Sequence, residues 1–70
     1  MQAIVASLAG TVFKILVKPG DAVKAGDTVV ILESMKMEIP VEADASGVVQ
    51  EVPHREGDFV NEGDPLVIVS

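Results

Sequence analysis

Short runs of valine, isoleucine and leucine recur along the chain, and turn residues separate them at regular intervals. Runs rich in β-branched residues that are bounded by Gly, Pro and Asp indicate strands. No helix start signal precedes a window in which apolar residues recur with helical periodicity, so no helix is expected. The pattern predicts strands at residues 3–6, 11–17, 22–24, 28–33, 38–43, 48–54, 59–61 and 66–69.

The chain repeats itself at an offset of 37 residues. Residues 20–27 read G-D-x-V-x-x-G-D, and residues 57–64 read the same. Nine of 24 positions are identical when residues 10–33 are aligned with 47–70. A chain of 70 residues has no room for a third copy, so the two halves must form one domain.

This single domain, residues 1–70, is predicted to be all-β. Neither half can bury its own apolar face, which favours two interlocked four-stranded antiparallel sheets in a flattened barrel or sandwich with a pseudo-twofold axis. Gly adopts positive φ at little cost and Asp caps turns, so the Gly-Asp pairs have a structural role. The expected core is Ile4, Val12, Ile15, Val17, Val23, Ile31, Val41, Val49, Val52, Val60 and Ile68.

One segment, from Ser34 to Glu38, has no counterpart in the repeat. It joins the last strand of the first half to the first strand of the second, so a hairpin is expected there. Without Asn-Gly or Asp-Gly, a type I turn is predicted rather than type I′. The pseudo-symmetry places the chain ends opposite Lys36. Lys36 between Met35 and Met37 is a candidate docking epitope, and a simply solvated lysine is the alternative.

Composition narrows the possible partners. A net charge of −6 disfavours nucleic acids and anionic membranes. Two Phe and no Trp or Tyr leave little to stack on bases. No basic N-terminal region or long apolar run suggests export or a membrane span, so a cytoplasmic protein is expected.

The residues also indicate no catalytic machinery of the chain's own. The absence of cysteine excludes disulfides and thiolate metal sites. His54, the one histidine, aligns with Val17 in the repeat, which favours a structural or surface role. No general acid–base pair, metal cluster or phosphate-binding loop is evident, so the chain is not expected to be an enzyme.

The run E-S-M-K-M-E at residues 33–38, in register with both G-D-x-V-x-x-G-D segments, resembles the biotinyl domain of biotin carboxyl carrier proteins. The resemblance covers essentially the whole chain. The chain looks more like the short single-domain biotin/lipoyl attachment proteins, or like the C-terminal carrier domain of a larger carboxylase taken alone. The resemblance implies the same flattened barrel, biotin attached at Lys36, and recognition by partner enzymes through Met35 and Met37. Ser34, a further candidate for recognition by the ligase or a partner, stands where such carriers often have Ala.

The resemblance also implies the partners. A biotin protein ligase would join activated biotin to Lys36, and the carrier would then move carboxyl groups between a biotin carboxylase and a carboxyltransferase. Glu33 and Glu38 flank the hairpin as candidates for ligase docking or for solubility. The domain itself is expected to be monomeric.

Two alternatives stay open from the sequence. A lipoyl carrier has the same fold but usually places Asp before the modified lysine, where this chain has Met35, so biotin is favoured over lipoate. A short attachment protein could also accept both groups. The second alternative is an unmodified hairpin module that only binds, as in membrane-fusion adaptors. The lack of a coiled coil, lipid signal or export sequence argues against that module.

Overall fold

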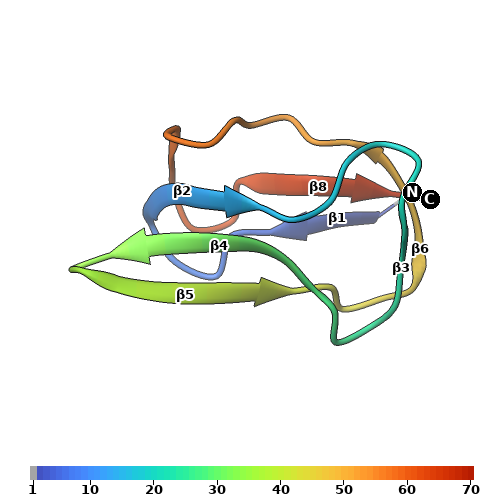
Figure 1. Cartoon of the computed structure of the whole chain (residues 1–70), viewed down its shortest axis with the longest axis horizontal. Coiled ribbons are helices and arrows are strands. Elements are labelled where there is room, and N and C mark those ends of the chain that lie inside the picture. The colour runs from blue at the N-terminus through green and yellow to red at the C-terminus, as the bar shows by residue number, and fades with distance from the viewer. Residues whose placement is uncertain (1) are drawn as a thin grey trace.

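The structure is a computed structural model that describes residues 2–70. The described residues form eight strands and no helix, as predicted, and therefore contain no helix that could span a membrane (Figure 1). Two predicted strands end early, at Ile15 instead of 17 and at Glu51 instead of 54. The strands are β1 Gln2–Val5, β2 Gly10–Ile15, β3 Ala22–Val23, β4 Thr28–Ser34, β5 Met37–Glu42, β6 Gly47–Glu51, β7 Phe59–Val60 and β8 Pro65–Val69.

The strands form two four-stranded sheets with the orders β1-β8-β6-β3 and β5-β4-β2-β7, and every pairing is antiparallel. Replacing each strand by its counterpart in the other half converts one order into the other. Each sheet takes two strands from each half, so neither half could fold alone into either sheet. The predicted flattened sandwich of interlocked halves is confirmed.

The β-bulges of the two sheets also follow the 37-residue repeat. The extra residue of a bulge is Phe13 in β2 and Gln50 in β6, which are 37 positions apart. The bulges that skip Val29 in β4 and Leu66 in β8 are related by the same offset. Because a bulge changes which face the following residues occupy, these positions are part of the repeated fold and decide what is buried.

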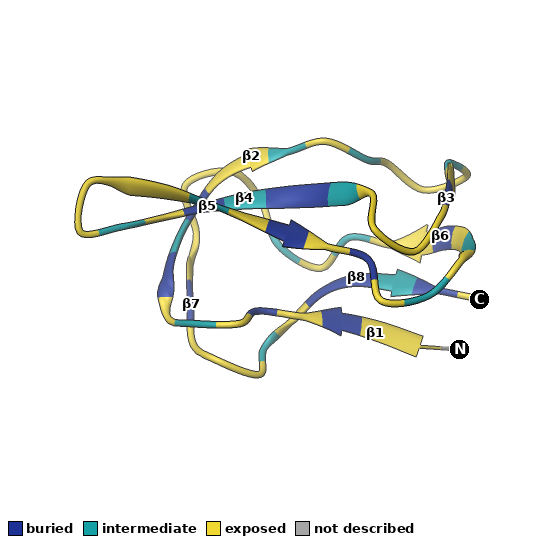
Figure 2. Cartoon of the chain, turned by 90° about the horizontal axis from the view of Figure 1, so that it is seen from below, coloured by how far each residue is buried: buried dark blue, intermediate teal, exposed yellow. Residues whose placement is uncertain are grey.

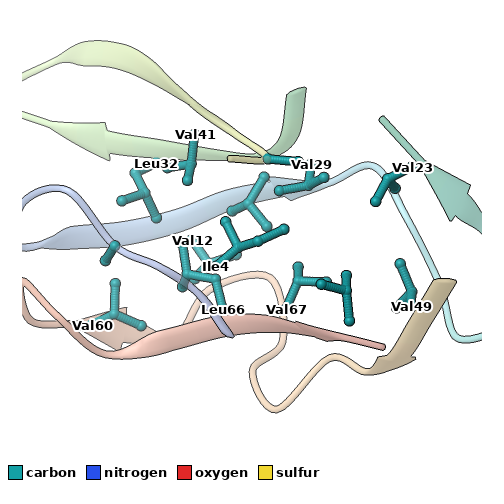
Figure 3. Close-up of a cluster of buried hydrophobic side chains, with 14 residues drawn as sticks. Ile4, Val12, Val23, Val29, Leu32, Val41, Val49, Val60, Leu66 and Val67 are labelled. Carbon is teal, nitrogen blue, oxygen red and sulfur yellow. The ribbon is translucent and has the colours of Figure 1, made fainter. Parts of the chain in front are cut away.

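Fourteen apolar residues form the core between the sheets (Figure 3). Six of the eleven predicted core residues are buried, and Ile15, Val17 and Val52 pack against the core half-buried. The prediction of Ile31 and Ile68 was wrong, because both lie outside the buried cluster. The core consists of Ile4, Ala6, Val12, Val23, Val29, Val30, Leu32, Val41, Ala43, Val49, Val60, Leu66, Val67 and Val69.

The four Gly-Asp turns share one geometry. In the first, the backbone N–H of Lys18 donates to Oδ2 of Asp21 at 3.0 Å, and the N–H of Asp21 donates to the carbonyl of Lys18 at 3.0 Å. Gly20 between them has a φ of 97°, which only glycine adopts readily. The predicted structural role of these pairs is confirmed. The turns are 18–21, 24–27, 55–58 and 61–64.

Candidate functional site: an exposed lysine hairpin

The hairpin that joins β4 to β5 has a loop of two residues. Ser34 pairs with Met37, which leaves only Met35 and Lys36 between the strands. Their φ angles are 53° and 65°, and positive φ at both central residues marks a type I′ turn. The prediction of a type I turn was therefore wrong. A two-residue loop must match the right-handed twist of its strands, and this requirement outweighs the residue preferences on which the prediction rested.

The turn places two ordinary side chains in a backbone conformation that favours glycine. A left-handed conformation costs roughly 1–2 kcal/mol for each residue that has a Cβ. The surrounding strands hold it in place, since Leu32 of β4 is 0% exposed and Val41 of β5 is 5% exposed. Strained residues of this kind collect at functional sites, where the structure around them supplies the compensating stability.

All six predicted site residues lie together on this hairpin. Met35 is 92% exposed and Met37 63% exposed, so neither methionine contributes to the core. Lys36 is exposed, and the structure gives it no ion-pair partner among residues 2–70. Figure 2 shows the exposed loop at one end of the molecule and the chain ends at the other, as the pseudo-symmetry predicts. The remaining predicted residues are Glu33 and Glu38, which are exposed, and Ser34, which is half-buried.

The hairpin carries an unfavourable pair of charges. Glu33 and Glu38 are directly opposite each other across β4 and β5. Like charges in that position destabilise a sheet. Lys36 is the one cation among residues 33–38, so acylation of its amine would remove the charge that offsets them. A hairpin that keeps two facing carboxylates and exposed methionines is better suited to contact with a partner than to the stability of the isolated domain.

Gly10 supports the base of the hairpin. A Cβ at this position would lie 2.8 Å from the backbone oxygen of Glu33, closer than side chains approach in folded proteins. The missing side chain lets β2 lie against β4 just before the loop. Gly10 was not among the predicted site residues, although its alignment with Gly47 in the repeat indicated a constraint shared by the two positions. Gly47 is under the same constraint from the backbone oxygen of Ser70.

His54 takes no part in the hairpin. Its Nδ1 lies 3.6 Å from Oδ2 of Asp58, and Asp58 itself caps one of the Gly-Asp turns. This contact agrees with the structural or surface role that the repeat alignment favours. Among residues 2–70, no group of three or more His, Asp and Glu side chains has the arrangement of a metal site.

We predict that Met35→Asn stabilises the domain. Asparagine tolerates positive φ better than methionine, so the free energy of unfolding should rise by about 0.5–1 kcal/mol. Urea unfolding followed by circular dichroism measures the change. Met37→Asn is the matched control: Met37 lies within β5, where asparagine is a poor strand former, so this variant should lose stability. Equal effects of the two substitutions would refute the strained turn.

The fold and the hairpin together define a class of protein: a small carrier domain that presents one lysine at the tip of a β-hairpin. Comparison with known sequences agrees, because the family model described as "Biotin-requiring enzyme" matches residues 2–69. The chain belongs to this biotin/lipoyl attachment family, as the sequence predicted.

Two relatives have nearly the same length as this chain. The "Biotin/lipoyl attachment protein" of Bacillus subtilis is 59% identical over 63 residues, which are 90% of this chain and 86% of the relative. The "Biotinylated protein TB7.3 homolog" of Mycobacterium leprae is 42% identical over 65 residues, 93% of this chain and 92% of the relative. Both names describe a protein that is modified, so the prediction of a carrier rather than an enzyme is confirmed.

A solved structure shows the same fold as one part of a large enzyme. The crystal structure of the urea carboxylase of Kluyveromyces lactis matches with a TM-score of 0.91 and 36% sequence identity. The match covers 99% of this chain and 6% of the carboxylase chain. The chain therefore corresponds to one small part of that carboxylase chain.

Proposed function

We propose that Lys36 of this chain carries biotin and moves carboxyl groups between a biotin carboxylase and a carboxyltransferase. The observation that carries the proposal is the place of Lys36: the exposed tip of a strained two-residue hairpin, in a chain of the biotin/lipoyl attachment family. The other lysines, Lys14, Lys18 and Lys24, lie in β2 or beside Gly-Asp turns, where the backbone is fixed by the fold.

The amine of Lys36 suits acylation by an external enzyme. Acylation requires its ammonium group to lose a proton, after which the free electron pair attacks the carbonyl carbon of biotinyl-AMP. The new C–N bond forms as the bond between the carbonyl carbon and the phosphate oxygen breaks, so AMP leaves and an amide remains. A base of the ligase takes the proton of the ammonium group, and the second proton, which the nitrogen loses as the amide forms, passes to solvent. Because no carboxylate of residues 2–70 is paired with Lys36, the ligase has no ion pair to break before it binds the side chain.

Biotin supplies a ring nitrogen that accepts a carboxyl group at one active site and releases it at another. The carrier contributes reach. Its long dimension is 31 Å, with the hairpin at one end and the chain ends at the other (Figure 1). A link through either end would leave the tip free to visit two active sites, and tethering raises its local concentration at each of them.

The carboxylase partner follows from the relatives, among which the urea carboxylase contains the same domain. The ligase and the carboxyltransferase are two further partners in this proposal. They are supported by the chemistry that an exposed lysine needs for loading and unloading. The cytoplasmic location and the monomeric state of the domain stay predictions from the sequence.

A lipoyl carrier is the second candidate, since the Bacillus subtilis relative is named for both groups. Intact mass spectrometry separates the two. The purified chain is incubated with biotin, ATP and a biotin ligase, or with lipoate, ATP and a lipoate ligase. We expect one biotinyl group per chain in the first reaction. A lipoyl adduct alone, or no adduct while a known carrier is modified in the same tube, would contradict the proposal.

A further inference from the structure

The two aromatic side chains of the protein are both exposed. Phe59 is 66% and Phe13 is 39% exposed, and the chain has no Trp or Tyr. Both lie on the β5-β4-β2-β7 sheet, which also carries the hairpin. Figure 2 shows β7 and the hairpin at the same end of the molecule. Phe59, the more exposed of the two, gains little stability from burial.

Strand register aligns Phe59 with the base of the hairpin. Thr11 of β2 lies opposite Phe59 on one side and opposite Glu33 on the other, and Glu33 lies opposite Glu38. Residues directly opposite each other in neighbouring strands project from the same face of a sheet. Phe59, Thr11, Glu33 and Glu38 therefore form one row across the outer face, here called the base row. The row contains an aromatic ring and two carboxylates and no cation.

The other half of the protein provides an internal comparison. The positions 37 residues from Phe59, Thr11 and Glu33 are Ala22, Val48 and Ser70. They pair in the same way, Ala22 with Val48 in the ladder and Val48 with Ser70 through reciprocal backbone hydrogen bonds of 3.0 and 3.3 Å. The same backbone thus accepts an alanine where the hairpin end has Phe59. In the other half, the counterpart of Phe59 has no aromatic ring and the counterpart of Glu33 has no carboxylate.

We propose that the base row is the surface on which the biotin ligase docks, with Phe59 in an apolar pocket of the ligase and Glu33 and Glu38 beside basic side chains. This inference rests on the proposed function. To form the amide, the ligase must bring its reacting carbon within about 3–3.5 Å of Nζ of Lys36, so its surface must cover the hairpin. A two-residue tip offers little contact area, and the base row is the adjoining surface.

Charge distinguishes the ligase from other occupants of this surface. A second copy of the chain would place carboxylates against carboxylates, which opposes association. Enzymes that act on the loaded carrier react with the far end of the attached group and not with Nζ of Lys36. The ligase alone acts at the lysine itself, and phosphate binding in its active site calls for the basic side chains that would complement Glu33 and Glu38.

Steady-state biotinylation kinetics test the proposal. The initial rate is measured against carrier concentration for the unmodified sequence, Phe59→Ala, Phe59→Leu and the control Val48→Ala. Val48 is 42% exposed and lies at the opposite end, beside Ser70. Loss of an aromatic anchor should raise the KM for Phe59→Ala about tenfold with kcat nearly unchanged. Phe59→Leu, which stays apolar, should fall between, and Val48→Ala should match the unmodified sequence.

The outcomes separate this proposal from the proposed function. If Phe59→Ala and Phe59→Leu keep the KM of the unmodified sequence while that sequence is biotinylated normally, the base row is not the docking surface and the carrier function stands. If the unmodified sequence takes up no biotin, the proposed function itself fails. Thermal unfolding of each variant shows whether it is folded. Should Phe59→Ala raise KM only with a loss of folded protein while folded Phe59→Leu stays unchanged, the docking role is overturned.

Discussion

Lys36→Arg is expected to abolish biotin uptake completely. The guanidinium of arginine stays protonated at any ordinary pH and has no free electron pair to attack an activated carboxyl group. The substitution keeps the positive charge and most of the length of the side chain, so the hairpin should retain its conformation. Intact mass after incubation with biotin, ATP and ligase should show no addition to this variant, even at long times and high enzyme concentration.

Lys24→Arg is the control for that experiment. Lys24 begins one of the Gly-Asp turns, with its N–H bonded to Oδ2 of Asp27 at 2.9 Å, and that bond uses the backbone rather than the amine. This variant should take up biotin at the same rate as the unmodified sequence. If Lys36→Arg still gained a biotinyl group, or if Lys24→Arg lost it, the assignment of the attachment residue would be wrong.

Leu32→Ala is expected to cause the largest loss of stability in the hairpin sheet. Leu32 is 0% exposed in β4, two residues before the strand ends at Ser34. Removing a fully buried leucine side chain costs about 2–5 kcal/mol through lost burial and the cavity that remains. A domain of this size has a core that supplies only about 3–5 kcal/mol of net stability. A substantial fraction of the variant should therefore be unfolded at 25 °C.

Urea unfolding followed by circular dichroism measures that loss, with Leu16→Ala as the matched control. Leu16 is 51% exposed, so truncation there should change the free energy of unfolding by no more than about 0.5 kcal/mol. Similar losses in the two variants would mean that the burial assigned to Leu32 does not hold in solution. The unfolded fraction of Leu32→Ala should also take up biotin slowly, because the ligase would meet no formed hairpin.

The sequence was sufficient to predict the fold because the repeat limits the possible arrangements. Two copies of G-D-x-V-x-x-G-D fix where each half turns, and neither half can bury its own apolar face. Interlocked sheets with the hairpin opposite the chain ends follow from those two facts. Lys36 was proposed as the attachment residue for a related reason, since it lies in the one segment that the repeat does not account for. The structure confirms the arrangement around that segment.

The sequence did not reveal which residues of β4 and β8 face the core. The run Val29-Val30-Ile31-Leu32 is apolar throughout, so alternation does not say which residues face inward. The bulge at Val29 turns it and Val30 toward the core and leaves Ile31 outside, and the bulge at Leu66 does the same to Ile68. Bulges depend on how strands pair, which is a property of the tertiary fold.

The prediction of the turn type of the hairpin was wrong for a comparable reason. Residue preferences describe the conformation that Met35 and Lys36 favour on their own, and those preferences exclude positive φ. The ladder between β4 and β5 leaves two residues for the loop, and the twist of the strands then imposes the left-handed conformation. Register is a long-range result of packing Leu32 and Val41 into the core, so local preferences could not predict it.

Exposed Phe59 shows a further limit. A phenylalanine next to a buried valine in a short strand is compatible with a core position when only the sequence is known. Phe59 lies at the base of the hairpin because β7 pairs with β2. It stands out because the corresponding position in the other half is Ala22. The position of that surface relative to Lys36 follows from a register that links residues far apart in the chain.

The most direct test of the account is to locate the biotinyl group by tandem mass spectrometry of peptides from the ligase-treated chain. Four lysines, at positions 14, 18, 24 and 36, offer side-chain amines. We expect the modification on Lys36 alone, with the other three unmodified at full conversion. Stoichiometric biotin on Lys14, Lys18 or Lys24 would contradict the claim that Lys36, at the exposed tip of the hairpin, is the attachment residue.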